Sequence, residues 1–479
     1  MAQHRPTPQP HASRRRLVVR VGIGAAALLL ATAGATDYEP PAGGDPRFDE
    51  GVLELLPGVD IQTILNRYGF TLRDSIESRN IHLVSFQPAM TNEQFELLFV
   101  ADPDVDHSEL NYDTGDAGPS TRSLFFGVAP AQFGAQPVWD TIGLSTAHDT
   151  ATGAGTTIAI IDTGLDTTNP MFLGLIDPAA ASFVGAPGDI QDVGNGINDD
   201  GDGMVDEMVG HGTWVTGIAH MVAPDAMLMP IRALDDEGFS NAFTLAKAVY
   251  YAVDHGADVV NLSLGSIAQV RIVERAVDDA SARGVIVVAA AGNQNAATPE
   301  FPAGNNKCAG IAAVDLGGVK ADFSNYSDGS GGNDLLLAAP GIDITGPVPG
   351  GFGEASGTSA AVPLVAGTAA LLIEKGTIRR WTDFRQMANH AAIDIRDQNP
   401  GLPDNALGKG MLDVAAATAW PGPCFADLTD DGVTDLADIE AFITLFVAHD
   451  EGVDYVAPRG VWDLGDLLFF VQSFIAGCP

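Results

Sequence analysis

Cysteine, aromatic residues and positive charge are all scarce in this chain of 479 residues. It holds 3 cysteines, and aromatic residues make up 7% of it. Lysine and arginine together number 24 against 62 aspartate and glutamate residues, which gives a formal net charge of −38. A phosphate backbone would be repelled by so acidic a chain, which argues against nucleic acid as a partner. The charge is consistent with a solvated acidic surface or with calcium uptake.

Long apolar runs are also missing beyond the first residues. The basic residues gather before residue 21, and an apolar stretch from Val21 to Ala33 follows, with small residues at its end. This pattern is typical of an export signal, which we predict over residues 1–35. The Ser13–Val18 segment also resembles a twin-arginine signal, an alternative to the general secretory route. No later run is long enough to cross a bilayer, so we expect a secreted or cell-surface protein with no transmembrane segment after the signal.

The three cysteines cannot all pair with one another. Cys308 lies in an apolar run and is expected to be a buried small hydrophobe. Cys424 and Cys478 bracket the last segment, and they could form a disulfide after export or stay unpaired.

Residues 46–113 have the pattern of a small α+β unit. Alternating apolar residues predict strands over 52–55 and 81–85, and helical periodicity predicts helices over 61–68 and 92–100. A stretch containing Gly, Ser, Thr and Pro follows over residues 114–136 and is interpreted as a linker.

Residues 137–418 alternate short apolar runs with helical periodicity. The runs of strand length are residues 157–161, 259–262, 285–290 and 335–338, and the predicted helices are residues 241–255 and 269–283. Runs that are apolar throughout suit parallel strands buried on both faces. The alternation predicts an α/β fold with a doubly wound, mostly parallel sheet and a site at the carboxyl ends of its strands.

Three short segments carry an acid, a base and a nucleophile beside glycine or other small residues. They centre on Asp162, His211 and Ser359, in that order. A serine hydroxyl is a poor nucleophile until a histidine takes its proton, and a carboxylate fixes the tautomer of that histidine. Each residue alone has a structural explanation as a helix cap, strand end or turn residue. Together they predict a catalytic triad, with Ser359 at the start of a buried helix in whose first turn Pro363 is tolerated.

The order of these segments resembles that of the subtilisin-like serine proteases, or subtilases. The resemblance covers Gln136 to Val414, and it includes the segments 259–265, 289–293 and 337–341. It implies that Asn293 binds the oxyanion and that the substrate is bound by Ser263, Leu264, Gly265, Ala290, Ala291 and Gly292. Two departures are Trp214, where a second histidine is common, and Ala360, where methionine is usual.

Further expectations follow from the same resemblance. Residues 46–113 are similar to the inhibitory propeptides of the family, which implies a zymogen with its processing site within residues 114–136. An unrelated N-terminal domain is the alternative. Small residues at Ala290, Ala291 and Gly292 suggest a roomy first specificity pocket that accepts apolar side chains.

Two acidic loops place oxygen-bearing side chains at alternate positions with a glycine at the turn, as an EF-hand loop does. The first loop lies just before His211, and its ligand candidates are Asn198, Asp200, Asp202 and Asp206. A calcium ion bound there would brace the histidine segment. A solvated acidic loop is the alternative.

The second acidic loop precedes an apolar helix. Its ligand candidates are Asp427, Thr429, Asp431, Val433, Asp435 and Asp438. The same spacing of glycine, aspartate and leucine recurs at Gly460–Asp466, so the loop and its helix are duplicated. In the second copy Tyr455, Ala457 and Arg459 stand at the first three ligand positions. Residues 424–479 therefore resemble a small helical dockerin-like module with one surviving structural Ca²⁺ site.

The sequence as a whole predicts a secreted serine endopeptidase that acts on protein or peptide substrates and is made as a self-processed zymogen. Its partners would be its substrates, its own propeptide as inhibitor, and a protein bound by the C-terminal module. The alternative is a catalytically silent subtilase fold that serves as a binding or scaffold protein attached through that module.

Overall fold

The computed structural model describes most of the chain from Pro46 onward. The described residues are 46–114, 125–186, 188–198, 203–266, 269–329, 334–423, 426, 428, 434–449, 453, 455–456 and 461–476. The predicted signal, the predicted Cys424–Cys478 pair and most of the acidic-loop residues lie outside them. Among the described residues, no helix combines the length and apolar character needed to span a membrane.

A seven-stranded sheet forms the centre of the predicted α/β region. Its spatial order is β13-β12-β11-β10-β6-β8-β7, and its paired neighbours are parallel. The strands are β6 (Thr157–Asp162), β7 (Ala181–Ser182), β8 (Met227–Arg232), β10 (Val259–Leu262), β11 (Ile286–Ala290), β12 (Ala309–Val314) and β13 (Leu337–Pro340). The prediction of a mostly parallel α/β sheet is confirmed.

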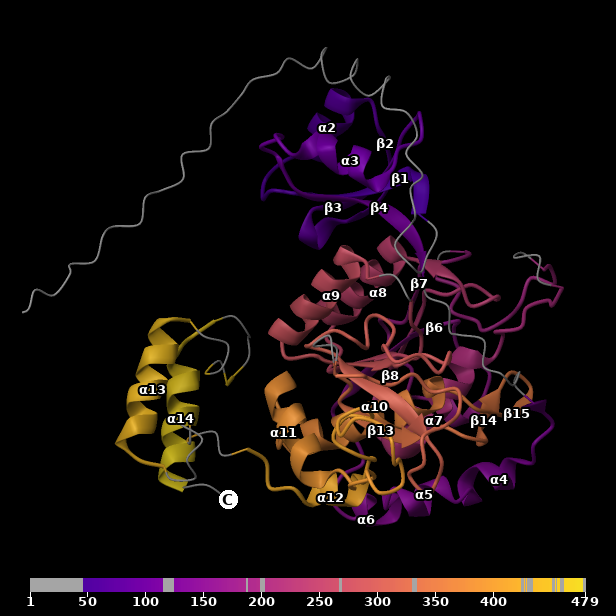
Figure 1. Cartoon of the computed structure of the whole chain (residues 1–479), viewed down its shortest axis with the longest axis vertical. Coiled ribbons are helices and arrows are strands. Elements are labelled where there is room, and N and C mark those ends of the chain that lie inside the picture. Colours follow the sequence, from indigo (N-terminus) through magenta and orange to yellow (C-terminus); the bar gives the residue numbers. More distant parts are fainter. Residues whose placement is uncertain are drawn as a thin grey trace, which may run out of the picture. The chain divides into compact units, whose positions relative to one another are not determined.

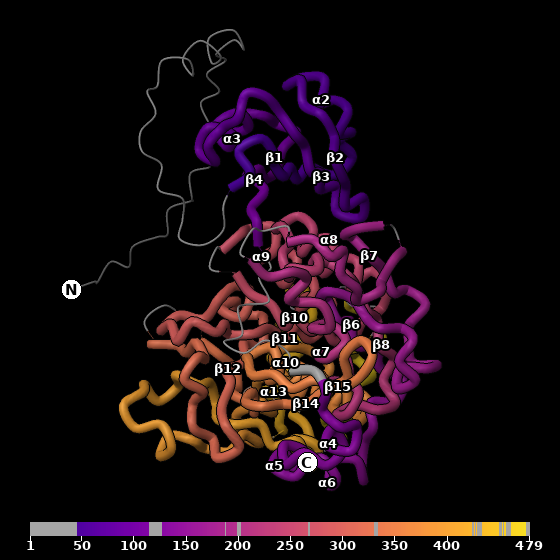
Figure 2. The backbone as a smooth tube through the Cα atoms, turned by 90° about the vertical axis from the view of Figure 1, so that its right-hand side faces the viewer, coloured from indigo at the N-terminus to yellow at the C-terminus, as the bar shows by residue number. Residues whose placement is uncertain are grey.

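Helices cover both faces of this sheet, as Figures 1 and 2 show from two directions. One face carries α7 (His211–Val222) and α10 (Thr358–Glu374), and the other carries α8 (Ala242–Asp254) and α9 (Arg271–Ala282). Successive residues of a strand alternate between faces. Ile158 and Ile160 of β6 pack in the core that contains α7 and α10, whereas Ala159 and Ile161 pack in the core that contains α8 and α9. The alternation puts Asp162 on the α7 and α10 side.

Several connecting elements complete this region. They are β9 (Ser240–Asn241), β14 (Ile344–Val348), β15 (Gly351–Ala355), α5 (Val138–Thr141), α6 (Leu144–His148), α11 (Trp381–Ala391), α12 (Val414–Ala419) and the short helix η2 (Pro170–Phe172). Cys308 is buried and has no disulfide partner among the described cysteines, as the sequence led us to expect.

The stretch interpreted as a linker is partly ordered into regular structure. β5 (Phe125–Phe126) pairs with β15, and α4 (Pro130–Ala135) follows it. Residues 115–124 of the same stretch lie outside the described residues.

Residues before the linker fold into an antiparallel sheet with two α-helices and one short 3₁₀ helix. The strands are β1 (Pro46–Leu55), β2 (Thr71–Ile76), β3 (Ile81–Ser85) and β4 (Val105–Thr114), and the helices are α2 (Ile61–Tyr68), α3 (Asn92–Phe99) and η1 (Glu77–Arg79). The aromatic ring of Phe95 packs so closely on Gly51 that any side chain at Gly51 would overlap it. At its far edge β4 pairs with β9 through Asp113–Asn241 and Thr114–Ser240.

The last part of the chain contains two helices, α13 (Leu436–Val447) and α14 (Leu464–Ala476), drawn in yellow in Figure 1. Phe442 of α13 stacks on Phe470 of α14 with ring centroids 4.1 Å apart. These residues are the equivalent aromatic positions of the two copies of the sequence repeat.

Candidate active site

Asp162 and His211 form a buried hydrogen-bonded pair. Asp162 ends β6, His211 begins α7, and His211 Nδ1 lies 2.8 Å from Asp162 Oδ1. The same carboxylate oxygen accepts the backbone N–H of Thr163 at 2.8 Å. An Nδ1–H held by a carboxylate leaves the other ring nitrogen, Nε2, as the basic one.

The backbone on either side of His211 lies so close to the loop after β6 that only glycine fits there. Gly210 has φ +97°, in the left-handed region that favours glycine. A Cβ at Gly212 would overlap the carbonyl oxygen of Gly164, and the Gly212 N–H donates instead to Thr163 Oγ1 at 2.9 Å. The two glycines on either side of His211 therefore let α7 start directly against the end of β6.

Asp192 holds the first turn of α7 and was not predicted as a site residue. Its Oδ1 accepts the N–H of Gly210 at 2.9 Å and the hydroxyl of Thr163 at 3.0 Å. Its Oδ2 accepts the N–H of Thr213 at 2.9 Å and the Thr213 hydroxyl at 2.6 Å. Burial raises the pKa of Asp192 above its ordinary value, although the hydrogen bonds from Thr213 and Gly210 act to lower it. One buried side chain thus connects the loops of both Asp162 and His211.

Ser359 is the second residue of α10, a helix whose residues from Thr358 to Leu372 are all buried. The sequence led us to expect Pro363 within the first turn, but it lies inside the helix. Proline has no N–H, so the carbonyl oxygen of Ser359, four residues earlier, lacks its helical donor. Ser263 Oγ donates to that oxygen at 3.0 Å, and Ser359 Oγ lies 3.2 Å from the carbonyl oxygen of Ser263.

The sheet register brings the Ser359 and His211 segments together. Asn261 of β10 pairs with Ile160 of β6, so that Ser263 and Asp162 lie at the same level beyond neighbouring strands. Paired strands are about 4.8 Å apart. Ser359 is hydrogen-bonded to Ser263 and His211 to Asp162, so the nucleophile and the base lie over adjacent strand ends, where a doubly wound sheet binds ligands.

Asn293 lies beside the start of α10 with its amide oriented by two donors. Its Oδ1 accepts the N–H of Thr358 at 2.9 Å and the Thr358 hydroxyl at 3.0 Å. Because the oxygen faces these two donors, the amide nitrogen Nδ2 is left to donate elsewhere. An N–H group beside the backbone N–H at a helix start suits an oxygen that acquires negative charge.

The residues expected to bind substrate border this site mainly through their backbone. Leu264 and Ala291 have side chains buried in the core that contains α8 and α9, and the Ala290 side chain is buried in the core that contains α7 and α10. The Ser263 hydroxyl is engaged with Ser359. Gly265 and Gly292 have no side chains, and the Glu300 carboxylate lies beside both of them.

The structure describes only part of each predicted calcium loop. Asp206 accepts the N–H groups of Asn195 and Gly196 at 3.0 Å and 2.9 Å, and Asn198 is the other described candidate of that loop. In the second loop, Asp438 accepts the N–H groups of Leu428 and Asp435 at 2.8 Å and 2.9 Å. The remaining candidates, Asp200, Asp202, Asp427, Thr429, Asp431 and Val433, lie outside the described residues. The described residues contain no group of three or more metal-ligating side chains.

Comparisons with known proteins agree with this geometry. The model of the Subtilase family matches residues 153–410. M-protease of Shouchella clausii (strain KSM-K16) is 34% identical over 56% of this chain and 65% of its own length, and subtilisin Savinase of Lederbergia lenta is 34% identical over 56% of this chain and 92% of its own length. Matches to the first of these relatives thus span just under two thirds of its length.

A solved structure extends the likeness in fold. Fervidolysin from Fervidobacterium pennivorans, described as a keratinolytic enzyme related to subtilisin, superposes with a TM-score of 0.63 and 21% identity. The superposition covers 81% of this chain and 63% of fervidolysin. At this identity the likeness concerns the fold alone.

Proposed function

The chain belongs to the subtilase family, and on that premise we propose that it is a secreted serine endopeptidase. The observation that carries the proposal is the 2.8 Å hydrogen bond between His211 Nδ1 and the buried carboxylate of Asp162. Ser359 is held at the helix start beyond the neighbouring strand, where it can act with this pair.

In the proposed reaction, Ser359 Oγ attacks the carbonyl carbon of the scissile peptide bond. Nε2 of His211 takes the hydroxyl proton and later gives it to the leaving amine, so that the C–N bond breaks and an acyl-enzyme forms. Water, activated by the same nitrogen, then releases the acid product. Asp162 keeps the proton of His211 on Nδ1 and stabilises the imidazolium.

Asn293 and the start of α10 would stabilise the tetrahedral intermediate. Asn293 Nδ2 and the backbone N–H of Ser359 are the proposed donors to its oxyanion. The positive end of the α10 dipole acts in the same direction. The donors exist before substrate arrives, because the bonds from Thr358 fix the Asn293 amide.

Substitution of the nucleophile tests this function. We expect the full chain carrying Ser359→Ala to fold and be exported but to leave casein uncut, and to keep its N-terminal segment in a mass spectrum. Ser281→Ala on α9, away from the site, is the matched control and should behave like the unsubstituted chain. Casein cleavage by the purified Ser359→Ala variant would overturn the proposal.

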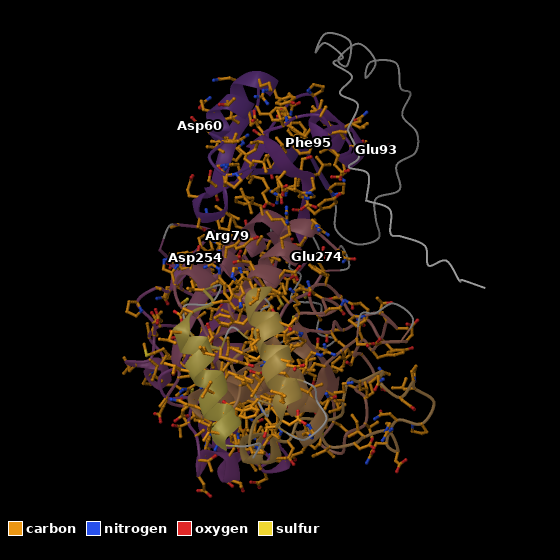
Figure 3. The ribbon with its side chains drawn as sticks, turned by 90° about the vertical axis from the view of Figure 1, so that its left-hand side faces the viewer. Asp60, Arg79, Glu93, Phe95, Asp254 and Glu274 are labelled. Atoms are coloured by element: carbon orange, nitrogen blue, oxygen red, sulfur yellow. The ribbon has the colours of Figure 1, made fainter. Side chains whose placement is uncertain are left out.

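We also propose that residues 1–35 are the export signal and that residues 46–113 are an inhibitory propeptide cut from the catalytic region, residues 137–418, within residues 114–136. Contacts of residues 46–113 with α8 and α9 support this. Arg79 bonds Asp254 at 3.0 Å and Asp279 at 2.6 Å, and Figure 3 labels Arg79 and Asp254. Glu109 accepts the N–H of Ile272 at 2.7 Å in the first turn of α9.

For the C-terminal part we propose a dockerin-like module, residues 424–479, with one structural calcium site in its first copy. The paired helices and the stacked Phe442 and Phe470 support a duplicated unit. Calorimetric titration of the full-length Ser359→Ala chain with Ca²⁺ tests the site. Adding Asp427→Ala and Asp431→Ala should remove this binding, whereas adding Asp463→Ala in the second copy should not.

The alternative function is that of a scaffold attached through this module. It is favoured by exposed apolar side chains on α13 and α14, among them Leu436, Ile443, Val447, Leu464, Leu468 and Ile475. Exposed apolar residues gathered on two helices are a feature of interaction surfaces. The casein assay separates the two functions, because a silent scaffold would leave casein intact with or without Ser359.

A further inference from the structure

Asn293 lies in a loop without helix or strand, residues 291–297, which follows β11. A second such loop, residues 323–328, belongs to the connection between β12 and β13. The two loops are bonded to each other, since the N–H of Asn295 donates to the carbonyl oxygen of Phe323 at 2.6 Å. The position of Asn293 therefore depends on contacts between these loops.

The side chain of Asn325, in the second loop, forms hydrogen bonds on both sides of Asn293. Its Oδ1 accepts the N–H of Gln294 at 3.0 Å and the N–H of Ala296 at 2.8 Å. Its Nδ2 donates to the carbonyl oxygen of Ala291 at 3.0 Å. Asn325 is 1% exposed, so solvent does not supply these bonds in its place. One buried amide thus binds the chain before and after Asn293.

Gly292 lets Asn325 approach this closely. Gly292 has φ +105°, and a Cβ there would lie only 2.3 Å from Asn325 Nδ2. The carbonyl oxygen of Gly292 also accepts the backbone N–H of Asn325 at 3.0 Å. The residue directly before Asn293 therefore leaves room for the Asn325 side chain and bonds to its backbone.

Gln294 connects Asn325 to the backbone of Asn293 itself. Gln294 Oε1 accepts a hydrogen bond of 2.9 Å from Asn325 Nδ2 and one of 3.1 Å from the N–H of Asn293. The other end of Asn293, its side-chain oxygen, accepts from Thr358. The Asn293 backbone is thus held through Asn325, and the Asn293 amide is held by Thr358.

We propose that Asn325 is the positioning residue of the oxyanion site, because it holds the loop that aims Asn293 Nδ2 at the developing charge. The inference rests on the proposed peptidase function and deepens it, since it concerns how one donor of that reaction is held. Such a donor is effective only when it already points to the place of the oxyanion. A displacement of about 1 Å can cost about a hundredfold in rate.

A double-mutant cycle between Asn325 and Asn293 tests the proposal. The kcat for a peptide substrate is measured per self-processed chain for the unsubstituted protein, the two single variants and the double variant. We expect Asn325→Ala to lower kcat about tenfold to a hundredfold, and Asn293→Ala to lower it about 10²–10³-fold. The double variant should match Asn293→Ala within about threefold, because Asn325 then has no donor left to position.

A merely structural role of Asn325 would give a different result, since its loss would lower kcat equally in both backgrounds. Asn399→Ala is the matched control, because the Asn399 amide also forms three hydrogen bonds with backbone groups outside the site. It should lower the unfolding temperature and leave kcat unchanged. If Asn325→Ala fails to fold, Asn325→Asp takes its place in the cycle, since it keeps both acceptor bonds and loses the donor bonds.

The outcomes separate this inference from the proposed function. Equal losses of kcat on Asn325→Ala in the presence and absence of Asn293 would overturn the positioning role and leave the peptidase function intact. An unchanged kcat in Asn325→Ala would do the same. Cleavage of no peptide by the unsubstituted chain would overturn the peptidase function, and the inference with it.

Discussion

The hydroxyl of Ser263 donates a hydrogen bond of 3.0 Å to the carbonyl oxygen of Ser359. This bond replaces the helical donor that is missing because Pro363 has no N–H. The bond also ties the start of α10 to the end of β10, the strand beside the one that carries Asp162. The position of the nucleophile thus depends on a side chain outside the triad.

Ser263→Ala should remove the hydroxyl donor from the buried carbonyl oxygen of Ser359. We expect a loss of about 1–3 kcal/mol in the free energy of unfolding and a lower kcat. In a Pro363→Ala background, where residue 363 regains an N–H, the same change should cost less. Thermal unfolding of the four chains of this double-mutant cycle measures the coupling, and strictly additive losses would contradict the account.

Asp192→Ala should loosen the first turn of α7 and with it His211. Four hydrogen bonds to a buried carboxylate would be lost, which we expect to cost about 2–4 kcal/mol of stability. A displaced base should lower kcat about tenfold to a hundredfold with little change in KM. Steady-state kinetics well below the unfolding temperature check this. Asp189→Ala in the same loop is the control, and an equal effect there would contradict the role given to Asp192.

Asn293→Asp should separate the acceptor role of the Asn293 side chain toward Thr358 from its proposed role as donor to the oxyanion. The carboxylate can still accept from Thr358, whereas the Nδ2 donor is lost. We expect kcat to fall by about 10²–10³, the range known for loss of this donor in subtilisin itself. The unfolding temperature should stay close to that of the unsubstituted chain, while Asn293→Ala should lower both quantities.

Arg79→Ala should weaken the binding of residues 46–113 to α8 and α9. The Arg79 guanidinium lies between Asp254 and Asp279, with its side chain 14% exposed. Loss of a largely buried cation between two carboxylates is expected to weaken the complex about tenfold to a hundredfold. Co-elution of the cut N-terminal segment with the catalytic region, followed on dilution, measures this. Arg73→Ala, which loses only a bond to Ser85 within residues 46–113, should not change the co-elution.

Acid should release the same contact only below about pH 4. Burial acts to raise the pKa of Asp254, but hydrogen bonds from Ser78 and Arg79 lower it below its ordinary value. A carboxylate whose pKa is lowered by a contact stabilises that contact fully at pH values above its ordinary pKa of about 3.9. The stabilisation is lost as the pH falls through the lowered pKa. Co-elution should therefore persist from pH 7 to about pH 5. In Asp254→Asn it should be weaker at neutral pH and change less on acidification.

The sequence predicted the elements whose residues follow a simple period. β6, β10 and β11 consist mainly of apolar residues, and α8 and α9 show helical periodicity, so their positions followed from the pattern. β8 did not, because Pro230 lies in its middle and proline argues against a central strand. That strand pairs with β6 on one side and with the two-residue β7 on the other.

The site residues that lie in short sequence motifs could be predicted from the sequence. Asp162, His211, Asn293 and Ser359 each lie in a recognisable segment. Asp192 acts across loops of irregular sequence, and nothing in its spacing indicates that it contacts Thr213. Contacts of this kind depend on how loops fold back, which local propensity does not specify.

The packing of residues 46–113 on α8 and α9 has a consequence for solubility. Residues 46–113 share one continuous apolar core with these helices, and the apolar side chains of α8 and α9 that pack against them would be exposed to water once residues 46–113 are removed. A chain begun at residue 125 should therefore be prone to self-association while it folds, so that the proposed propeptide would also keep the catalytic region soluble.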